Sequence, residues 1–146
     1  MLSKLKSILI KTHENNEVED DVLIYKAAGA LMLEIARADN DVEVIETDEI
    51  ISSLREIFQD LNLGEEEFLS DLKELVEESI STYEFTHVIN EQCSRDEKIK
   101  ILEALWRVSY VDGRIDKYEE YFIRKIMDLL HLSHSDFIKA KLKVLK

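Results

Sequence analysis

Two stretches of this chain share an acidic pattern, D-[NG]-x-[VI]-[DE]-x-x-E, whose side chains could hold a divalent cation. The spacing matches the back half of an EF-hand calcium loop, in which Asp, Gly, a branched aliphatic residue, an acid and a terminal Glu occupy fixed positions. The front half of that loop is missing, because its ligand positions hold no carboxylate. They fall on Val108 and Tyr110 in one copy, and on Ile35 and Arg37 in the other.

A cation site built on this pattern would draw on the carboxylates of both turns. If the two copies pack about a pseudo-two-fold axis, the two acidic clusters would come close together. Like charges held close cost free energy unless a hard cation such as Ca²⁺ or Mg²⁺ is shared between them. We predict no other cofactor. The candidate ligands are Asp112, Asp116 and Glu119 in the second copy, and Asp39, Glu43 and Glu46 in the first.

The same turns also have a purely structural interpretation. Gly113, one of only three glycines, and Asn40 can adopt the left-handed conformation that ends a helix. The aliphatic residue of the pattern would point inward and attach the turn to the core. Asp116 can cap the next helix, with Glu119 reaching back to it, and none of this needs an ion. Both interpretations stay open on the sequence alone.

Other chemistries have weaker support. His131 and His134 are three residues apart, as in some zinc sites, but they straddle a predicted helix boundary and no nearby Cys or acid completes a tetrahedral set. A surface position is therefore the favoured interpretation. His87 and Cys93 are six apart on one predicted helix, which does not place them side by side. Because no nucleophile and base pair, phosphate-binding glycine loop or nucleotide motif is present, we expect no enzymatic activity.

The elements that position these residues are expected to be helices. An acid three residues after a Ser or Asp can close a capping box, which marks a helix start. Four such pairs are Ser81 with Glu84, Ser94 with Glu97, Asp116 with Glu119, and Ser133 with Asp136. They predict helices near 82–92, 95–110, 117–130 and 134–145. Upstream, apolar periodicity predicts helices near 2–13, 18–38, 46–61 and 65–80.

The chain also repeats itself. The segment ALMLEIARADNDVEVIE (30–46) aligns without a gap on EALWRVSYVDGRIDKYE (103–119). After one extra helical turn in the first copy, LNLGEEEF (61–68) aligns on LHLSHSDF (130–137). The internal repeats therefore cover about 30–68 and 103–137, and each comprises a helix, an acidic turn, a second helix and a short cap.

Composition supports the same architecture. The chain has 146 residues, of which 45% are hydrophobic and 35% charged, and it contains no proline. This length suits one domain with a real core, and the lack of proline favours long helices over a turn-rich β fold. We expect an all-α protein: a single compact domain over residues 1–146, with about seven to eight helices and an internal helix, acidic turn, helix duplication.

The charge distribution restricts the partners. A net charge of −13 removes the general attraction to phosphates, so nucleic acid is not expected as a partner. Residues 34–78 hold sixteen acids and three bases, whereas both ends of the chain are basic. Those basic ends are expected to be solvated helix faces; the alternative is a weak peripheral contact with a membrane surface or an acidic partner. Their lysines are Lys4, Lys6, Lys11, Lys139, Lys141, Lys143 and Lys146.

The cellular compartment follows from cysteine content and hydropathy. The single cysteine, Cys93, excludes an intramolecular disulfide and fits a reducing compartment. No segment approaches the roughly 18 apolar residues that a membrane span needs, and the first thirteen residues are too short and too charged for a signal peptide. We expect a soluble cytoplasmic protein without stable membrane insertion.

A family resemblance emerges from these segments. Residues 83–145, which include the specific motif LWRVSYVDGRID-x-x-E, together with the segment 30–46, resemble the TerB-like family. This family includes tellurite resistance protein TerB and the N-terminal domain of the co-chaperone DjlA, and the resemblance covers about residues 22–145. It implies an all-helical domain with an internal duplication. TerB-like proteins are associated with bacterial resistance to tellurite and related stresses, and are thought to act through protein contacts or divalent cations, not by catalysis.

Carried over residue by residue, the resemblance places the family's acidic turn on Asp112, Gly113, Asp116 and Glu119, and on Asp39 in the first copy. This chain departs from the family at Asn40, where Gly is usual, and in the extra turn after Glu46. Both departures argue against a symmetric pair of sites. We therefore expect a non-enzymatic module that binds a partner protein in a stress response, with a divalent-cation binder or sensor as the alternative and a homodimer as a further option.

Overall fold

The computed structural model describes residues 16–37, 44–57, 65–77, 82–111, 113 and 115–145. These residues form seven helices and no strand, which confirms the all-α prediction. The helices are α2 (Asn16–Ala36), α3 (Val44–Ile57), α4 (Glu65–Glu77), α5 (Thr82–Gln92), α6 (Arg95–Tyr110), α7 (Lys117–Leu129) and α8 (His134–Leu145). Their bounds lie within a few residues of the predicted ones. The helix predicted near 2–13 lies outside the described residues.

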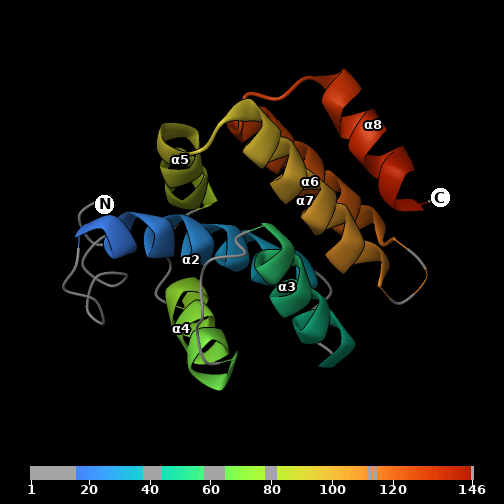
Figure 1. Cartoon of the computed structure of the whole chain (residues 1–146). Coiled ribbons are helices and arrows are strands. Elements are labelled where there is room, and N and C mark those ends of the chain that lie inside the picture. Colours follow the sequence, from blue (N-terminus) through green and yellow to red (C-terminus); the bar gives the residue numbers. More distant parts are fainter. Residues whose placement is uncertain are drawn as a thin grey trace.

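Helix α2 is the central element of the molecule. It contacts α3, α4, α5, α6 and α7, and Figure 1 shows it crossing the fold with α5 on one side and α4 on the other. From Leu23 to Ala36 every residue except Glu34 is buried. A helix surrounded by neighbours must be largely apolar on all sides, and this stretch is, apart from Glu34 and the buried Lys26, whose Nζ lies 3.0 Å from Asp71 Oδ2 of α4. The broad apolar surface of α2 therefore determines where the other helices pack.

Gly29 allows the close approach of two of these neighbours. A Cβ atom at this position would lie 3.0 Å from Leu72 Cδ1 of α4 and 3.1 Å from Leu54 Cδ1 of α3. These distances are shorter than ordinary carbon contacts, which are about 3.5 to 4.0 Å. The missing side chain thus lets α3 and α4 pack directly on the backbone of α2.

The two sequence repeats fold into equivalent helices. Asp112 follows Asp39 by 73 residues, and the start of α7 follows the start of α3 by the same interval. The start of α8 follows that of α4 by 69 residues, as Leu130 follows Leu61. In each repeat the first helix contacts both later ones, and α3 contacts α6 as α7 contacts α2. These intervals and contacts agree with the predicted duplication; most of the extra turn of the first copy falls in 58–64, outside the described residues.

The predicted helix starts are made by local hydrogen bonds. At α6, Ser94 Oγ accepts from the backbone N–H of Glu97 (3.2 Å), and Glu97 Oε1 accepts from the backbone N–H of Ser94 (2.9 Å). Ser133 and Asp136 exchange the equivalent bonds at α8, at 3.1 and 3.0 Å. These bonds satisfy backbone donors that a helix start otherwise leaves without partners. Ser81, of the pair predicted before α5, lies outside the described residues.

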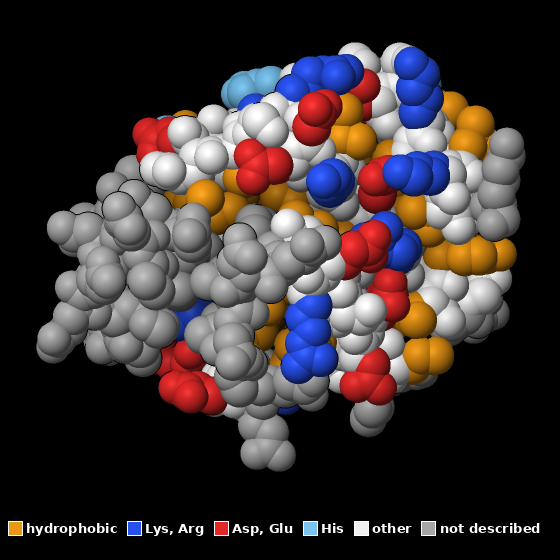
Figure 2. Space-filling view, in the orientation of Figure 1, with side chains coloured by type: hydrophobic (Ala, Val, Ile, Leu, Met, Phe, Trp, Pro, Cys, Tyr) orange, Lys and Arg blue, Asp and Glu red, His pale blue; other side chains and the backbone are white. Residues whose placement is uncertain are grey.

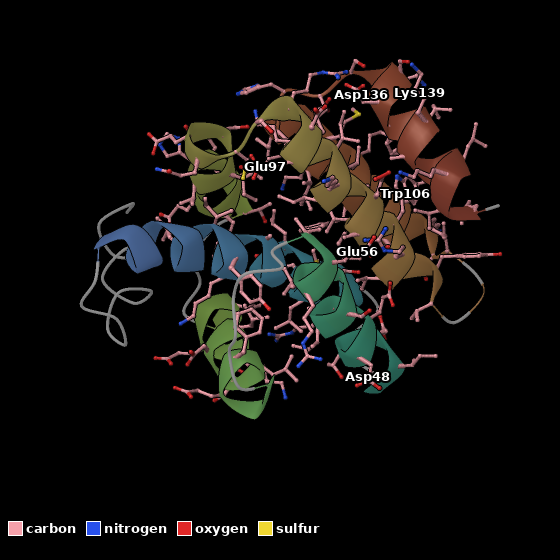
Figure 3. All side chains as sticks on the ribbon, viewed as in Figure 1. Asp48, Glu56, Glu97, Trp106, Asp136 and Lys139 are labelled. Atoms are coloured by element: carbon pink, nitrogen blue, oxygen red, sulfur yellow. The ribbon has the colours of Figure 1, made fainter. Side chains whose placement is uncertain are left out.

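The second repeat has a core organised around Trp106. This side chain is fully buried, as predicted, and lies between α6 and α8 (Figure 3). Its ring centroid is 4.9 Å from that of Phe137, in a tilted arrangement. Such aromatic pairs add stability beyond the area that they bury. The Trp106 and Phe137 pair thus attaches α8 to the rest of the fold.

Candidate functional site

The acidic turn of the second repeat begins with a left-handed glycine. Gly113 has φ +93°, and its backbone N–H donates to the carbonyl oxygen of Tyr110 at 2.9 Å. No atom lies within 4 Å of where a Cβ would be, so the backbone conformation, and not lack of space, favours glycine here. Ile115, the aliphatic residue of the pattern, packs partly buried against the core. Both features agree with the structural interpretation of the turn.

Asp116 and Glu119 form the capping box of α7. Asp116 Oδ1 accepts a hydrogen bond of 2.7 Å from the backbone N–H of Tyr118. Glu119 is buried, with 5% of its surface exposed, and its Oε1 accepts from the backbone N–H of Asp116 at 3.4 Å. The predicted capping role of these two carboxylates is confirmed, and it brings them together at one helix end.

The other candidate ligands are less completely placed. Glu46 lies in the first turn of α3 and is buried, with 7% of its surface exposed. Asp112, Asp39 and Glu43 lie outside the described residues. Within the described ranges, no three His, Cys, Asp or Glu side chains are grouped so that they could hold a metal ion. The cation site therefore stays a prediction.

His131 and His134 end one helix and begin the next. His131 has φ +60°, its backbone N–H donates to the Asp128 carbonyl, and the Leu132 N–H donates to the Met127 carbonyl, both at 3.1 Å. This pair of bonds is a Schellman motif, in which a left-handed residue ends a helix. The ring of His134 stacks on Phe137, with 6.0 Å between centroids. Both histidines are exposed, in agreement with the predicted surface position.

The left-handed conformation of His131 was not predicted. Its signal was in the alignment of LHLS (130–133) on LNLG (61–64), which places Asn62 opposite His131. Asparagine is the residue that, after glycine, most often ends a helix in this conformation. The alignment of His131 with an asparagine therefore indicated a helix end and not a ligand site.

Burial raises the pKa values of three described groups, Tyr25, Glu34 and Cys93. Glu34 on α2 accepts a 2.8 Å hydrogen bond from Thr82 Oγ1 at the start of α5, and its burial raises its pKa to about 6. The Thr82 hydroxyl and the charges of Lys125 and Arg37 oppose this rise. Burial also raises the pKa of Cys93 to about 12, so its thiol stays protonated at neutral pH. Of these buried groups, Glu34 is the one whose charge changes nearest to neutral pH.

Some predicted basic residues of the C-terminal end take part in ion pairs. Lys143 Nζ lies 3.0 Å from Glu103 Oε2 of α6, and Lys141 Nζ lies 3.2 Å from Glu120 Oε1 of α7. Lys139 is exposed, and the other lysines of the two basic ends lie outside the described residues. Figure 2 shows Lys and Arg side chains along the upper edge of the molecule, near α8. Part of the basic end is therefore used to hold α8 in place.

The most distinctive exposed surface lies on α7. Tyr121 and Tyr118 are the most exposed large hydrophobic side chains of the described residues, with exposed fractions of 70% and 61%. Next to them is a shallow depression lined only by α7 residues. We call this surface the α7 face and define it as Lys117, Tyr118, Glu120, Tyr121 and Arg124. This surface was not predicted, because a tyrosine on a helix can face either the core or the solvent.

Hydropathy of the helices bears on membrane contact. Of the helices that the structure describes, none combines the length and the apolar character needed to cross a membrane. This finding agrees with the prediction of no stable membrane insertion.

Comparison with known proteins places the chain in a family. The model of the family described as "Tellurite resistance protein TerB" matches residues 25–142, a range that includes both acidic turns. No curated protein and no solved structure matches the chain.

Proposed function

The chain belongs to the tellurite resistance protein TerB family, and on this premise we propose that it is a non-enzymatic, cytoplasmic module that binds a partner protein in a stress response. The observation that carries this proposal is the α7 face. Tyr and Arg are enriched at protein interfaces and among the residues that contribute most to binding, because they combine a large contact area with hydrogen bonding. Two exposed tyrosines beside Arg124 on one rigid helix match that composition.

The local role of the acidic side chains also supports a non-enzymatic module. Asp116 and Glu119 are used in helix capping, and Asp136 caps α8 while pairing with Arg95. These contacts give each carboxylate a structural task.

Affinity capture from the native cytoplasm tests the proposal. The bait is the full chain, and the variant is Tyr118→Ala with Tyr121→Ala. We expect the wild-type chain to retain a specific partner and the double variant to retain at least about tenfold less, because interface tyrosines are frequent hot spots. Tyr83→Ala is the control, since Tyr83 is 60% exposed but lies on α5. Circular dichroism verifies that all baits are folded.

Two outcomes would contradict this proposal. If the wild-type chain retains no specific partner, the interaction function is lost. If Tyr83→Ala on α5 reduces capture as strongly as the double variant does, the α7 face is not the surface that binds the partner.

A divalent-cation binder or sensor is the second candidate. Its supporting observation is that Asp116 and Glu119 meet at one helix end directly after the left-handed Gly113, as the calcium-loop pattern requires. Ca²⁺ or Mg²⁺ that binds only the folded state would raise the free energy of unfolding by about 2.7 kcal/mol at a hundred times the dissociation constant.

Calorimetry and thermal unfolding with Ca²⁺, Mg²⁺ or EDTA test the cation function. We expect an ion-dependent rise of the unfolding midpoint in the wild-type chain and none in Asp112→Asn with Asp116→Asn. Asp128→Asn, an exposed change on α7, is the control and should keep the shift. No shift with either ion, or an equal shift in the double variant, would rule this function out.

A further inference from the structure

We propose that the α7 face binds the outer face of α4 from a second copy of this chain, so that the protein associates with itself through an antiparallel pair of helices. This inference goes beyond the proposed function, because it concerns association between two copies of the chain and specifies the two helices in contact. It rests on the exposure, charge and spacing of side chains on two helices.

The charge of the α7 face is positive despite the acidic chain around it. Glu120 is its only acid, and the Glu120 carboxylate lies 3.2 Å from Lys141 Nζ and 3.8 Å from Arg124 Nη2. Two cations thus already neutralise this carboxylate. Lys117, whose Nζ lies 5.3 Å from the Tyr118 ring centroid, has no acid opposite it on the face. The face therefore offers cations and two tyrosine rings to a partner of negative charge.

The outer face of α4 has the opposite character. Phe68 and Leu72 are buried against the core, so α4 turns its other side to solvent. That side carries a stripe of four exposed residues at helical spacing, three of them acids, and the exposed Lys73 lies beside the stripe, so the described exposed side chains of α4 hold three acids and one base. The stripe consists of Glu67, Ser70, Glu74 and Glu77. We call it the α4 stripe.

The two surfaces have matching spacing. Lys117 and Arg124 are seven residues apart, as are Glu67 and Glu74, which corresponds to about 10.5 Å along each helix axis. Two helices laid antiparallel can therefore align both charge pairs at once. In that register the small Ser70 lies opposite the large Tyr121, which leaves room for the ring. The three facing pairs are Lys117 with Glu74, Tyr121 with Ser70, and Arg124 with Glu67.

Packing among the helices that the structure describes leaves both surfaces available. Helix α4 packs on α2 through its apolar side, and α7 packs on α2, α5, α6 and α8 through its own. The two copies would also be oriented by their uneven charge. Residues 34–78 hold sixteen acids against three bases, whereas residues 117–146 hold seven bases against four acids. This charge complementarity orients two copies as they meet. It favours contact of the acidic segment of one copy with the basic segment of the other, over contact between two segments of the same charge.

A charge-swap experiment by sedimentation velocity tests this contact. Lys117→Glu and Glu74→Lys each reverse one member of a facing pair. Both changes suit their helices, because an acid is favourable in the first turn and a base near the last turn. The full chain of each variant is measured alone and in an equimolar mixture, over a range of concentrations at physiological salt. Lys100→Glu, an exposed change on α6 with the same alteration of charge, is the control.

We expect the wild-type chain to associate with itself, and each single variant to do so about tenfold more weakly, since an attraction becomes a repulsion. The mixture should associate more strongly than either variant alone, because the new carboxylate at position 117 of one copy then faces the new ammonium group at position 74 of the other. The control should behave as the wild type does, apart from a small effect of net charge.

Three results would overturn the inference: a wild-type chain that stays monomeric throughout, a control that weakens association as much as Lys117→Glu, or a mixture no stronger than its components. None of these results contradicts the proposed function, because capture of a different partner from the cytoplasm is measured separately.

Discussion

At the scale of single residues, Glu34 is the group whose protonation should affect stability most directly. Its pKa is raised from 4.5 to about 6 by burial, so between these values the folded chain binds more protons at this group than the unfolded chain does. The contribution of Glu34 to the free energy of unfolding therefore falls as pH rises through that window. Above pH 6 the buried charge costs about 2 kcal/mol.

Glu34→Gln should remove this dependence, because the amide stays neutral and its oxygen can still accept from Thr82. Relative to the wild type, we expect the variant to become more stable by about 1 to 2 kcal/mol between pH 4.5 and 7. Urea unfolding across this range measures the difference. Glu77→Gln, an exposed change on α4, is the control. Parallel stability curves for Glu34→Gln and the wild type would contradict the role of Glu34.

At the scale of the elements, helix ends combine sequence signals with backbone geometry. The starts of α6, α7 and α8 have capping boxes in which Ser or Asp side chains bond the backbone. The C-terminal end of α7, in contrast, is followed by a histidine, His131, at φ +60°. A residue with a Cβ is strained in this conformation and glycine is not. The helix end is otherwise well formed, because Met127 and Leu132, the residues at the two ends of the Schellman hydrogen bond, are both buried.

His131→Gly should therefore stabilise the protein by about 0.5 to 1 kcal/mol. His131→Ala is the matched control, because it also removes the imidazole but keeps the Cβ atom in the left-handed conformation. Chemical unfolding of the three proteins compares their free energies of unfolding. A glycine variant no more stable than the alanine variant would show that backbone strain at this helix end is not limiting.

At the scale of the whole molecule, the two repeats share one core. Helix α2 of the first repeat contacts α6 and α7 of the second, and α3 contacts α6. Polar contacts also cross between them: Arg107 Nε of α6 lies 3.4 Å from Glu49 Oε1 of α3. Neither repeat can expose the shared surface without losing apolar burial, which is the main favourable term in folding.

We therefore expect one cooperative unfolding transition for the chain, as the single-domain prediction requires. Trp106, the only tryptophan, reports on the second repeat by fluorescence, and circular dichroism reports on the helices of both. The two signals should give the same midpoint in urea. Separate midpoints would show that the repeats unfold independently.

The sequence by itself determined the helices, the duplication and the capping roles of Asp116 and Glu119. These features depend on residues three or four positions apart, or on a repeat within the chain, so their physical cause lies within short segments. Only the tertiary structure decided that Glu34 is buried against Thr82, that Tyr118 and Tyr121 face solvent, and that Gly29 lies under Leu54 and Leu72. Each of these depends on which distant helix packs there, and periodicity along a single helix does not contain that information.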